Sequence, residues 1–386
     1  MRRASLPPLC LAGCLLEFDP VLLEQAPKSA IAAGTIHTCA IADDDHTYCW
    51  GANSFGALGV PAPGESTDPL RVDDARWRHV ATAGNYANFT CGAQHDGSLW
   101  CWGADGDAML GQGELGDALT MPASVALDGD VVMVGAGSTA GIALDDEGVL
   151  WAWGWNNAAL GLADETLPYL YEPAPLVPDG GEAWSFVDYG RIHGCGIRGD
   201  ANTLWCWGDP ETTALGRDDG ERIPAPIASA ADGWRMVAAG DSGMDSAHTC
   251  GIKQDGTLWC WGTNVDGRLG IADVDTTIAP LQVGDADDWH TVGGGERHTC
   301  GIRDPGTLWC WGAGDYGQLG DGGTTARATP FQVGDRDDWI DLSVGAAHSC
   351  GRTKDGTLWC WGSNSNGQTA QPQFGVTARP SNVAFP

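Results

Sequence analysis

The sequence is poor in basic residues and has no long hydrophobic run. Its 386 residues include 20 Lys and Arg against 51 Asp and Glu, which gives a net charge of −31. A protein this acidic repels nucleic acid, because phosphate binding needs a basic surface. No run of about 18 apolar residues is present, so no segment is expected to cross a membrane as a helix. The composition therefore argues against nucleic-acid-binding and membrane-spanning functions.

Despite its charge, the chain has enough apolar material to fold. Hydrophobic residues make up 43% of it, and it contains 19 Trp, 57 Gly and 14 Cys. A disordered chain has few aromatic residues, so we expect a substantial core. A chain of this length normally forms two or three domains, unless a repeat organises it as one unit.

An internal repeat does organise the chain. The segment Tyr48-Cys49-Trp50-Gly51 recurs six times with small changes, and in the third copy Ala152 replaces the cysteine. The second aromatic residue of each copy falls at positions 50, 102, 153, 207, 261, 311 and 361, so the spacing is 50 to 54 residues. The chain therefore contains seven copies of one structural unit.

Each unit is predicted to form four short strands without helical periodicity. In the unit that starts at Trp289, Gly, Pro and Asp residues separate strand-like pieces at 289–292, 298–302, 307–311 and 330–333. Four strands in about 50 residues are typical of a propeller blade. We therefore predict an all-β fold, a seven-bladed β-propeller of four-stranded antiparallel blades over residues 30–386.

The two ends of this region are predicted to close the ring. Residues 30–34 resemble a first strand and residues 380–385 resemble a fourth strand. We expect the N- and C-terminal strands to join in one sheet, because this pairing hides an open edge.

The repeat also resembles a known family. The pattern Gly-x-x-His-Thr-Cys-Gly-Ile is followed by Asp-Gly-Thr-Leu-Trp-Cys-Trp-Gly and then by segments such as Gly317-Gln318-Leu319-Gly320. This order is similar to the regulator of chromosome condensation repeat, and the resemblance covers roughly residues 30–386. It implies a seven-bladed propeller. It is less specific for function, because the family includes guanine-nucleotide exchange factors, inhibitors and scaffolds.

Cysteines occur in pairs within six of the seven units. If residues 254–256 form a three-residue hairpin loop, Cys250 lies directly opposite Cys260, within disulfide reach. The third unit lacks both partners and carries Ala140 and Ala152 instead. We favour disulfides in an oxidising compartment over free thiols or metal ligands. The predicted pairs are Cys39–Cys49, Cys91–Cys101, Cys195–Cys206, Cys250–Cys260, Cys300–Cys310 and Cys350–Cys360.

Tryptophan and histidine also recur with the repeat. The two Trp that flank a Cys share one face of their strand, so we expect them to pack against the next blade. Histidines precede the first Cys by two residues in five units and are interpreted as structural hydrogen-bonding residues, because a catalyst is needed once, not five times. No unique acid–base pair stands out, so we assign no catalytic residue, metal site or cofactor. The five histidines are His37, His193, His248, His298 and His348.

Binding residues are predicted where the repeat breaks, since the repeated positions build the scaffold. Three segments depart from the pattern, although each could also be a tolerated insertion. The candidate residues are Asn85, Tyr86 and Asn88, then Trp155, Tyr169 and Tyr171, then Asp241, Ser242 and Met244.

Acidic residues are predicted to gather on one face of the disc. Many Asp residues fall between the second and third strands, as at Asp255, or between blades, as at Asp285. In an up-and-down blade these two loops lie on the same side. The candidate segments at residues 85–88 and 241–246 would then lie on the opposite face.

The N-terminus resembles an export signal. Leu11-Ala12-Gly13-Cys14 is similar to the lipoprotein pattern in which the Cys is lipidated, although Pro7 and Pro8 interrupt a short apolar stretch. We predict a signal over residues 1–14, with lipidation at Cys14, and a linker over 15–29. A plain cleaved signal or a misplaced start codon would also account for this segment.

These observations favour an exported or surface-anchored bacterial scaffold that binds another protein, is not an enzyme and is a monomer. One alternative is an exchange-factor-like regulator of a small GTPase, which the disulfides and the charge oppose. A further alternative is a carbohydrate-binding or lyase-type propeller, which would need a unique site. We expect no nucleic-acid partner, and membrane contact only through a lipid anchor.

Overall fold

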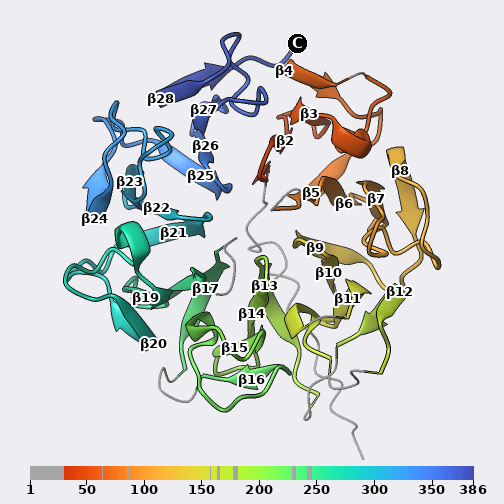
Figure 1. Cartoon of the computed structure of the whole chain (residues 1–386), viewed down its shortest axis with the longest axis horizontal. Coiled ribbons are helices and arrows are strands. Elements are labelled where there is room, and N and C mark those ends of the chain that lie inside the picture. The colour runs from red at the N-terminus through yellow and green to blue at the C-terminus, as the bar shows by residue number, and fades with distance from the viewer. Residues whose placement is uncertain are drawn as a thin grey trace, which may run out of the picture.

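The computed structural model is a ring of seven blades (Figure 1). It describes residues 30–62, 64–84, 87–156, 158–162, 166–176, 181–227, 232–240 and 246–386. Each blade is an antiparallel sheet of four strands that are consecutive in the chain. The predicted all-β, seven-bladed propeller is therefore confirmed. Among these residues, no helix has the length and apolar character that crossing a bilayer requires.

The first strand of each blade lies nearest the centre of the ring (Figure 1). These inner strands are β1 (Ile31–Ala33), β5 (Trp77–Thr82), β9 (Val131–Ala136), β13 (Trp184–Tyr189), β17 (Trp234–Ala239), β21 (Trp289–Gly294) and β25 (Trp339–Val344). The second strands are β2 (His37–Ile41), β6 (Phe89–Gln94), β10 (Ala140–Asp145), β14 (His193–Arg198), β18 (His248–Lys253), β22 (His298–Arg303) and β26 (His348–Thr353).

The third strands carry the Trp-Cys-Trp segments, as predicted. They are β3 (Thr47–Ala52), β7 (Leu99–Gly103), β11 (Leu150–Trp155), β15 (Thr203–Gly208), β19 (Leu258–Thr263), β23 (Thr307–Gly312) and β27 (Leu358–Ser363). The outer strands are β4 (Glu65–Arg71), β8 (Leu119–Val125), β12 (Tyr169–Pro175), β16 (Ala225–Pro226), β20 (Thr276–Gln282), β24 (Arg327–Gln332) and β28 (Val376–Val383). Short 3₁₀ helices precede four of these outer strands: η1 (Ser54–Gly56), η2 (Ala158–Leu160), η3 (Thr213–Leu215) and η5 (Val265–Gly267).

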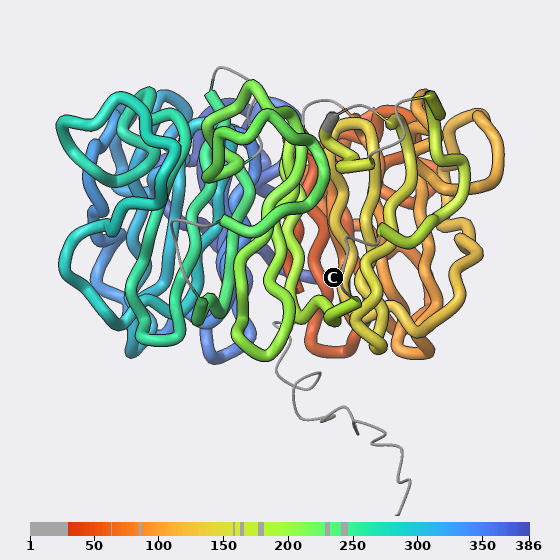
Figure 2. Tube along the Cα trace, turned by 90° about the horizontal axis from the view of Figure 1, so that it is seen from below, coloured from red at the N-terminus to blue at the C-terminus, as the bar shows by residue number. Residues whose placement is uncertain are grey.

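The strand order gives the disc two distinct faces, seen edge-on in Figure 2. We number the loops of a blade in chain order: loop one joins the first and second strands, loop two the second and third, and loop three the third and fourth, while loop four leads to the next blade. Because neighbouring strands are antiparallel, loops one and three share one face, which we call the loop-one face. Loops two and four share the other, the loop-two face.

The ring closes differently from the prediction. β1 pairs with β2 in the first blade and β28 pairs with β27 in the seventh, so the expectation that both terminal strands join one sheet is wrong. The reason is that every blade is built from one complete repeat, from a first strand to a fourth. Side chains close the ring instead: the Ala33 amide donates to Ser343 Oγ at 2.9 Å, and Phe385 packs on Tyr48.

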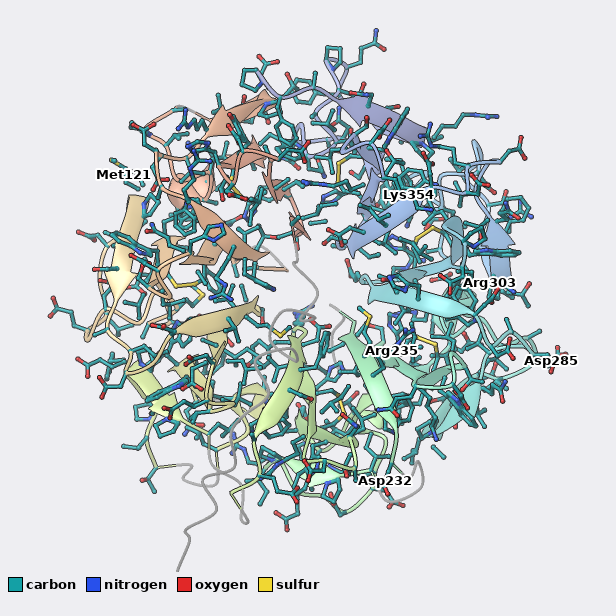
Figure 3. The ribbon with its side chains drawn as sticks, turned by 180° about the vertical axis from the view of Figure 1, so that it is seen from behind. Met121, Asp232, Arg235, Asp285, Arg303 and Lys354 are labelled. Atoms are coloured by element: carbon teal, nitrogen blue, oxygen red, sulfur yellow. A yellow bond between two sulfur atoms is a disulfide. The ribbon has the colours of Figure 1, made fainter. Side chains whose placement is uncertain are left out.

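All six predicted disulfides are present within their blades (Figure 3, yellow bonds). Cys250 lies directly across from Cys260 in the β18–β19 pair, with Cα atoms 4.1 Å apart. The hairpin between them turns as predicted, with Gly256 at a positive φ of 81°. A side chain there would also meet the Asp287 carbonyl, so this turn needs glycine on two counts.

Disulfides and tryptophans form the layers between blades. The Cys250–Cys260 bridge packs in one buried cluster with Trp289 and Trp311, which belong to the following blade. The second aromatic residue of each repeated segment, such as Trp311, is therefore buried as predicted, but it packs against the preceding blade, not the next one. Trp261 shows this contact directly, because its indole N–H donates to the Ala214 carbonyl of the preceding blade at 2.8 Å.

The third blade fills the place of the missing disulfide with aliphatic groups. Its residue opposite Ala152 is Ile142, so the assignment of Ala140 as the lost cysteine partner is wrong by two positions. Ala140 occupies the histidine position instead, since it pairs with Gly154 as His248 pairs with Gly262. Ile142 is fully buried and supplies volume where the other blades have sulfur.

Candidate interaction site

Repeated histidines link neighbouring blades. In each case a buried imidazole Nε2 lies within hydrogen-bond distance of a hydroxyl on the next blade. The pairs are His37–Thr90 (3.0 Å), His193–Thr249 (2.8 Å), His248–Thr299 (2.9 Å), His298–Ser349 (2.8 Å) and His348–Thr38 (2.7 Å).

The direction of these bonds follows from the second contact of each hydroxyl. Thr249 Oγ1 donates its one proton to the Ala214 carbonyl at 2.8 Å, so it accepts from His193, whose Nε2 carries a hydrogen. Burial lowers the pKa of His193 to about 4 and that of His298 to about 3, which keeps both rings neutral. The repeated histidines are thus structural, as predicted.

This network is interrupted on both sides of the third blade. Phe89 stands in the histidine position of the second blade, and Ala140 in that of the third. At the third-to-fourth interface Gly194 replaces the threonine, and Trp207 lies so close that a Cβ at Gly194 would be 2.4 Å from its ring. Trp207 Nε1 is buried without a hydrogen-bond partner among the described residues. Apolar packing therefore replaces the histidine–hydroxyl and indole bonds at this interface, while Ser138 Oγ still donates to the Arg191 carbonyl at 3.2 Å.

A cavity of about 640 Å³ opens on the loop-one face over the same region. Loops from blades 1 to 4 line it. Phe55 comes from loop three of the first blade and Trp155 from the end of β11, and Arg191 comes from loop one of the fourth blade. Loop three of the second blade contributes Asp105 and its neighbours. The large aromatic side chains stay exposed, by 62% for Phe55 and 42% for Trp155.

Asp105 organises the loop that forms one wall of this cavity. Its two carboxylate oxygens accept the Leu110 and Gly116 amides, each at 3.0 Å. In the fifth blade the same position is Asn264, whose amide group donates to two loop carbonyls. A carboxylate has no proton to donate, so at this position the second oxygen of Asp105 accepts the Gly116 amide instead. Burial raises the pKa of Asp105, which is 4% exposed.

Of the predicted binding residues, Trp155 lies in this cavity. Tyr169 pairs with it across the β11–β12 ladder, and the Tyr171 ring contacts that of Tyr169 at a tilt of 40°, with ring centroids 5.7 Å apart, but neither tyrosine lines the cavity. The Tyr171 carbonyl instead accepts the Gly113 amide at 2.9 Å and so ties the second blade's loop to the third blade. The structure thus groups Trp155 with loops that the sequence analysis had not joined to it.

The other candidate residues do not contribute to the described cavity wall. Asn88 is buried, with a φ of 53°, and its carbonyl accepts the Ala104 amide at 3.0 Å, which is a structural contact. The remaining candidates lie outside the described residues: Asn85, Tyr86, Asp241, Ser242 and Met244.

The loop-two face carries charges of both signs. In Figure 3 Asp285 and Asp232 lie toward the outside of the ring and Arg235 toward the centre. Several acids there are paired with arginine, as in Arg303–Asp288 (2.6 Å), Arg336–Asp338 (2.9 Å) and Arg71–Asp74 (2.8 Å). The described residues contain no group of three or more His, Cys, Asp or Glu arranged to hold a metal ion.

Sequence reasoning missed most of the cavity wall. Phe55, Asp107 and Arg191 come from three blades, and nothing in the repeat shows that their loops meet. One signal was available: Asp105 stands where the first, third, fifth and seventh repeats have asparagine. The change from asparagine to aspartate at this position indicates that loop three of the second blade differs from the repeated scaffold.

Sequence profiles identify the repeat. The regulator of chromosome condensation (RCC1) repeat matches residues 29–57, 246–268, 289–318 and 339–368, and a second profile of the same repeat matches 305–351. Two Arabidopsis thaliana proteins are similar over about two thirds of this chain. The mitochondrial RCC1 domain-containing protein RUG3 is 31% identical over 65% of this chain and 57% of its own length. The ultraviolet-B receptor UVR8 is 27% identical over 68% of this chain and 59% of the receptor. The chain thus matches less than two thirds of either relative.

Solved structures show the same architecture. Yeast RCC1 (Prp20), solved with Kap60 bound, superimposes with a TM-score of 0.79 over 100% of this chain and 90% of that one, at 19% identity. Human WBSCR16 superimposes with a TM-score of 0.71 over 82% of this chain and 84% of that one, also at 19% identity. At these identities the likeness concerns the fold alone. The chain thus contains regulator of chromosome condensation (RCC1) repeats and folds as a seven-bladed β-propeller.

Proposed function

We propose that this propeller is a non-enzymatic scaffold that binds another protein through the loop-one face over its second and third blades. The observation that carries this proposal is the 640 Å³ cavity, which lies where the repeat is interrupted and exposes Phe55 and Trp155. Exposed aromatic side chains around a hollow mark a recognition surface, because they offer large contact area at low entropic cost. We also propose that the scaffold is a monomer, because the hydrogen bonds between its blades join parts of one chain.

Relatives of this fold support the choice of a protein partner. Yeast RCC1 was crystallised with Kap60, and the structure of Prp20p is described with its binding to Gsp1p and histones. An exchange-factor role on a small GTPase is the alternative that this likeness suggests. We place it second because six disulfides fit an oxidising compartment, whereas disulfides are rare in cytosolic and nuclear proteins. No observation favours a carbohydrate-binding or lyase-type site.

We further propose export to the bacterial cell envelope or secretion. The intrablade disulfides support an oxidising location, and the acidic composition fits a soluble surface protein. The signal over residues 1–14, the lipidation of Cys14 and the linker over 15–29 lie outside the described residues and stay predictions. Labelling of the wild-type and Cys14→Ala proteins with a palmitate analogue would test the anchor.

A site-specific cross-linking experiment tests the binding face. A photoreactive phenylalanine analogue placed at Trp155 should capture a discrete partner in producing cells. Tyr316 offers a matched control, because it is an exposed aromatic residue of loop three in the sixth blade, on the same face but outside the cavity. Capture from position 155 but not from 316 supports the proposal. Equal capture from both positions, or none from 155, contradicts it.

A further inference from the structure

The cavity wall contains carboxylates without a matching cation. Asp105, Asp107 and Asp117 all belong to loop three of the second blade and line the cavity. Arg191 is the one basic residue among the described lining residues, and no ion pair of 4 Å or less joins it to a described carboxylate. The lining therefore carries three negative groups and one positive group.

Loop three is organised differently in other blades. In the fourth, fifth and sixth blades some of its carboxylates have arginine partners from the same chain: Asp219 pairs with Arg217, Asp266 and Asp315 with Arg297, and Asp321 with Arg327. The Arg297–Asp266 and Arg327–Asp321 pairs span 2.7 and 2.8 Å. Loop three of the second blade contains no such arginine pair among the described residues, and three of its carboxylates line the cavity.

Asp105 and Asp107 lie in surroundings that disfavour a carboxylate without a nearby cation. Asp105 is almost fully buried, and its oxygens accept only backbone amides. A buried carboxylate is costly unless it is paired. Burial raises the pKa of both Asp105 and Asp107, so the site disfavours their negative charge as it stands. A cation placed in the cavity would offset that cost.

The aromatic residues of the cavity are suited to the same kind of ligand. Phe55 and Trp155 line it from the first and third blades, and both are exposed. Aromatic faces attract cations and also cover the apolar stems of Lys and Arg. The chain shows this contact elsewhere: the Arg198 guanidinium lies 4.7 Å from the Trp205 ring centroid, and the Lys253 ammonium lies 5.2 Å from that of Trp259.

We propose that the cavity binds a Lys or Arg side chain from an extended, cationic segment of the partner protein. Asp107 and Asp117 would hold the charged group, and Trp155 would cover the stem. The volume, about 640 Å³, exceeds what one side chain fills, so neighbouring residues of the segment would enter as well. Arg191 would then donate to main-chain carbonyls of that segment. This inference rests on the proposed function, because it names the chemistry of the partner.

Short peptides provide a direct test. The probes are acetylated, amidated Gly-Ala-X-Ala-Gly peptides in which X is Arg, Lys, Gln or Leu, measured by isothermal titration calorimetry up to millimolar concentration. We expect the Arg and Lys peptides to bind at least about tenfold more tightly than the Gln and Leu peptides. Raising the salt concentration should weaken the charged peptides selectively, because partly exposed ion pairs are screened. A Leu peptide that binds as tightly as Arg, or an Arg peptide that does not bind, overturns the proposal.

Variants localise the binding. The double variant Asp107→Asn, Asp117→Asn and the single variant Trp155→Ala should each weaken the Arg peptide by about tenfold. Matched controls lie in loop three of the sixth blade on the same face: Asp315→Asn and Tyr316→Ala should leave binding unchanged. Equal losses in the control variants would contradict the site.

The two proposals fail separately. Cross-linking from position 155 combined with no preference for the Arg peptide would leave the binding face in place and remove its cationic chemistry. Selective peptide binding without cross-linking in cells would leave the cavity chemistry and remove the proposed partner.

Discussion

The third-to-fourth interface and the fifth-to-sixth interface show two ways to join the same blades. At the fifth-to-sixth interface a disulfide, a histidine–threonine bond and an indole–carbonyl bond all contribute: Cys250–Cys260, His248–Thr299 and Trp311 to Arg268. At the third-to-fourth interface Ile142 and Ala152 replace the disulfide, Ala140 replaces the histidine, and the Trp207 indole has no hydrogen-bond partner in the described part of the chain. Both interfaces keep the buried tryptophan and a backbone bond to the hairpin of the preceding blade: the Trp184 amide donates to the Gly148 carbonyl at 2.9 Å, and the Trp289 amide donates to the Gly256 carbonyl at 3.1 Å.

This difference distinguishes the apolar packing that closes the ring from the polar bonds and disulfides that strengthen it. Packing of Trp, Ile and Ala is enough to hold a blade against its neighbour, because buried apolar area supplies most of the stabilisation. The polar bonds and the disulfides add to that packing and fix the register. At the third-to-fourth interface, where the disulfide and the histidine bond are absent, loops on the loop-one face depart from the repeat and line the candidate cavity.

The largest effect is expected when the shared tryptophan is removed. Trp261→Ala and Trp207→Ala should each lower the free energy of unfolding by about 3–5 kcal/mol, because both side chains are fully buried. Trp261→Ala should cost about 1 kcal/mol more, since only Trp261 loses a hydrogen bond to a described carbonyl. Urea denaturation monitored by circular dichroism measures both. A Trp207→Ala variant as stable as the wild type would show that packing does not hold this interface.

The next effect concerns the disulfide. The double variant Cys250→Ala, Cys260→Ala should lower the free energy of unfolding by about 2–4 kcal/mol, because the bridge constrains the unfolded chain. Treatment with a reductant should likewise speed amide hydrogen exchange in β18 and β19. The third blade provides the internal control: exchange in β10 and β11 should not change on reduction, because this pair has no bridge. Equal acceleration in both blades would mean that the disulfides act on the whole ring.

Much of this architecture could be predicted from sequence, for physical reasons. The spacing of Cys250 and Cys260 around an Asp-Gly turn sets the register of the hairpin, so the disulfides followed from chain geometry. Trp261 follows Trp259 by two residues, and both positions recur with the repeat. This pattern likewise indicated that Trp261 is buried. By contrast, alternation along a strand does not state which neighbouring blade a side chain meets, because that depends on how the blades follow one another around the ring.

The candidate site was harder to predict, because its residues meet only through space. Trp155 was found since it breaks the repeat, whereas Asp107 and Arg191 are ordinary loop residues in the sequence. Whether a carboxylate is paired also depends on distant residues: Arg297 reaches Asp266 across 31 positions, and no such partner reaches Asp107 among the described residues.

A smaller effect is expected from acid. The pKa of His298 is lowered to about 3 and that of His348 to about 3, below the value of 6.5 that an unfolded chain shows. The unfolded state therefore binds protons first, and stability is complete above about pH 6.5 and is lost as the pH falls toward 4. Asp188 and Asp341 act in the opposite sense, since burial raises the pKa of each to about 6.

The repeated histidines outnumber these two acids, so we expect the melting temperature to fall between pH 6.5 and 4. The substitution His298→Phe copies Phe89 of the second blade and removes one titrating group. It should make the fall with pH less steep than in the wild type. A variant with an unchanged slope would show that the imidazoles do not set the acid sensitivity.

The smallest effect on stability is expected at Trp155, two residues beyond Trp153 on the same strand. Trp153 is fully buried and its indole N–H donates to the Met109 carbonyl at 2.8 Å, whereas Trp155 is 42% exposed in the cavity. Trp155→Ala should therefore lower the free energy of unfolding by about 1 kcal/mol or less, against about 3–5 kcal/mol for Trp153→Ala. Parallel urea titrations of the two variants measure the difference. Because a scaffold gains little from a large exposed indole at this position, a small loss of stability with a large loss of binding would show that Trp155 serves recognition. If the two variants were destabilised equally, Trp155 would be a core residue and the proposed face would lose its central contact.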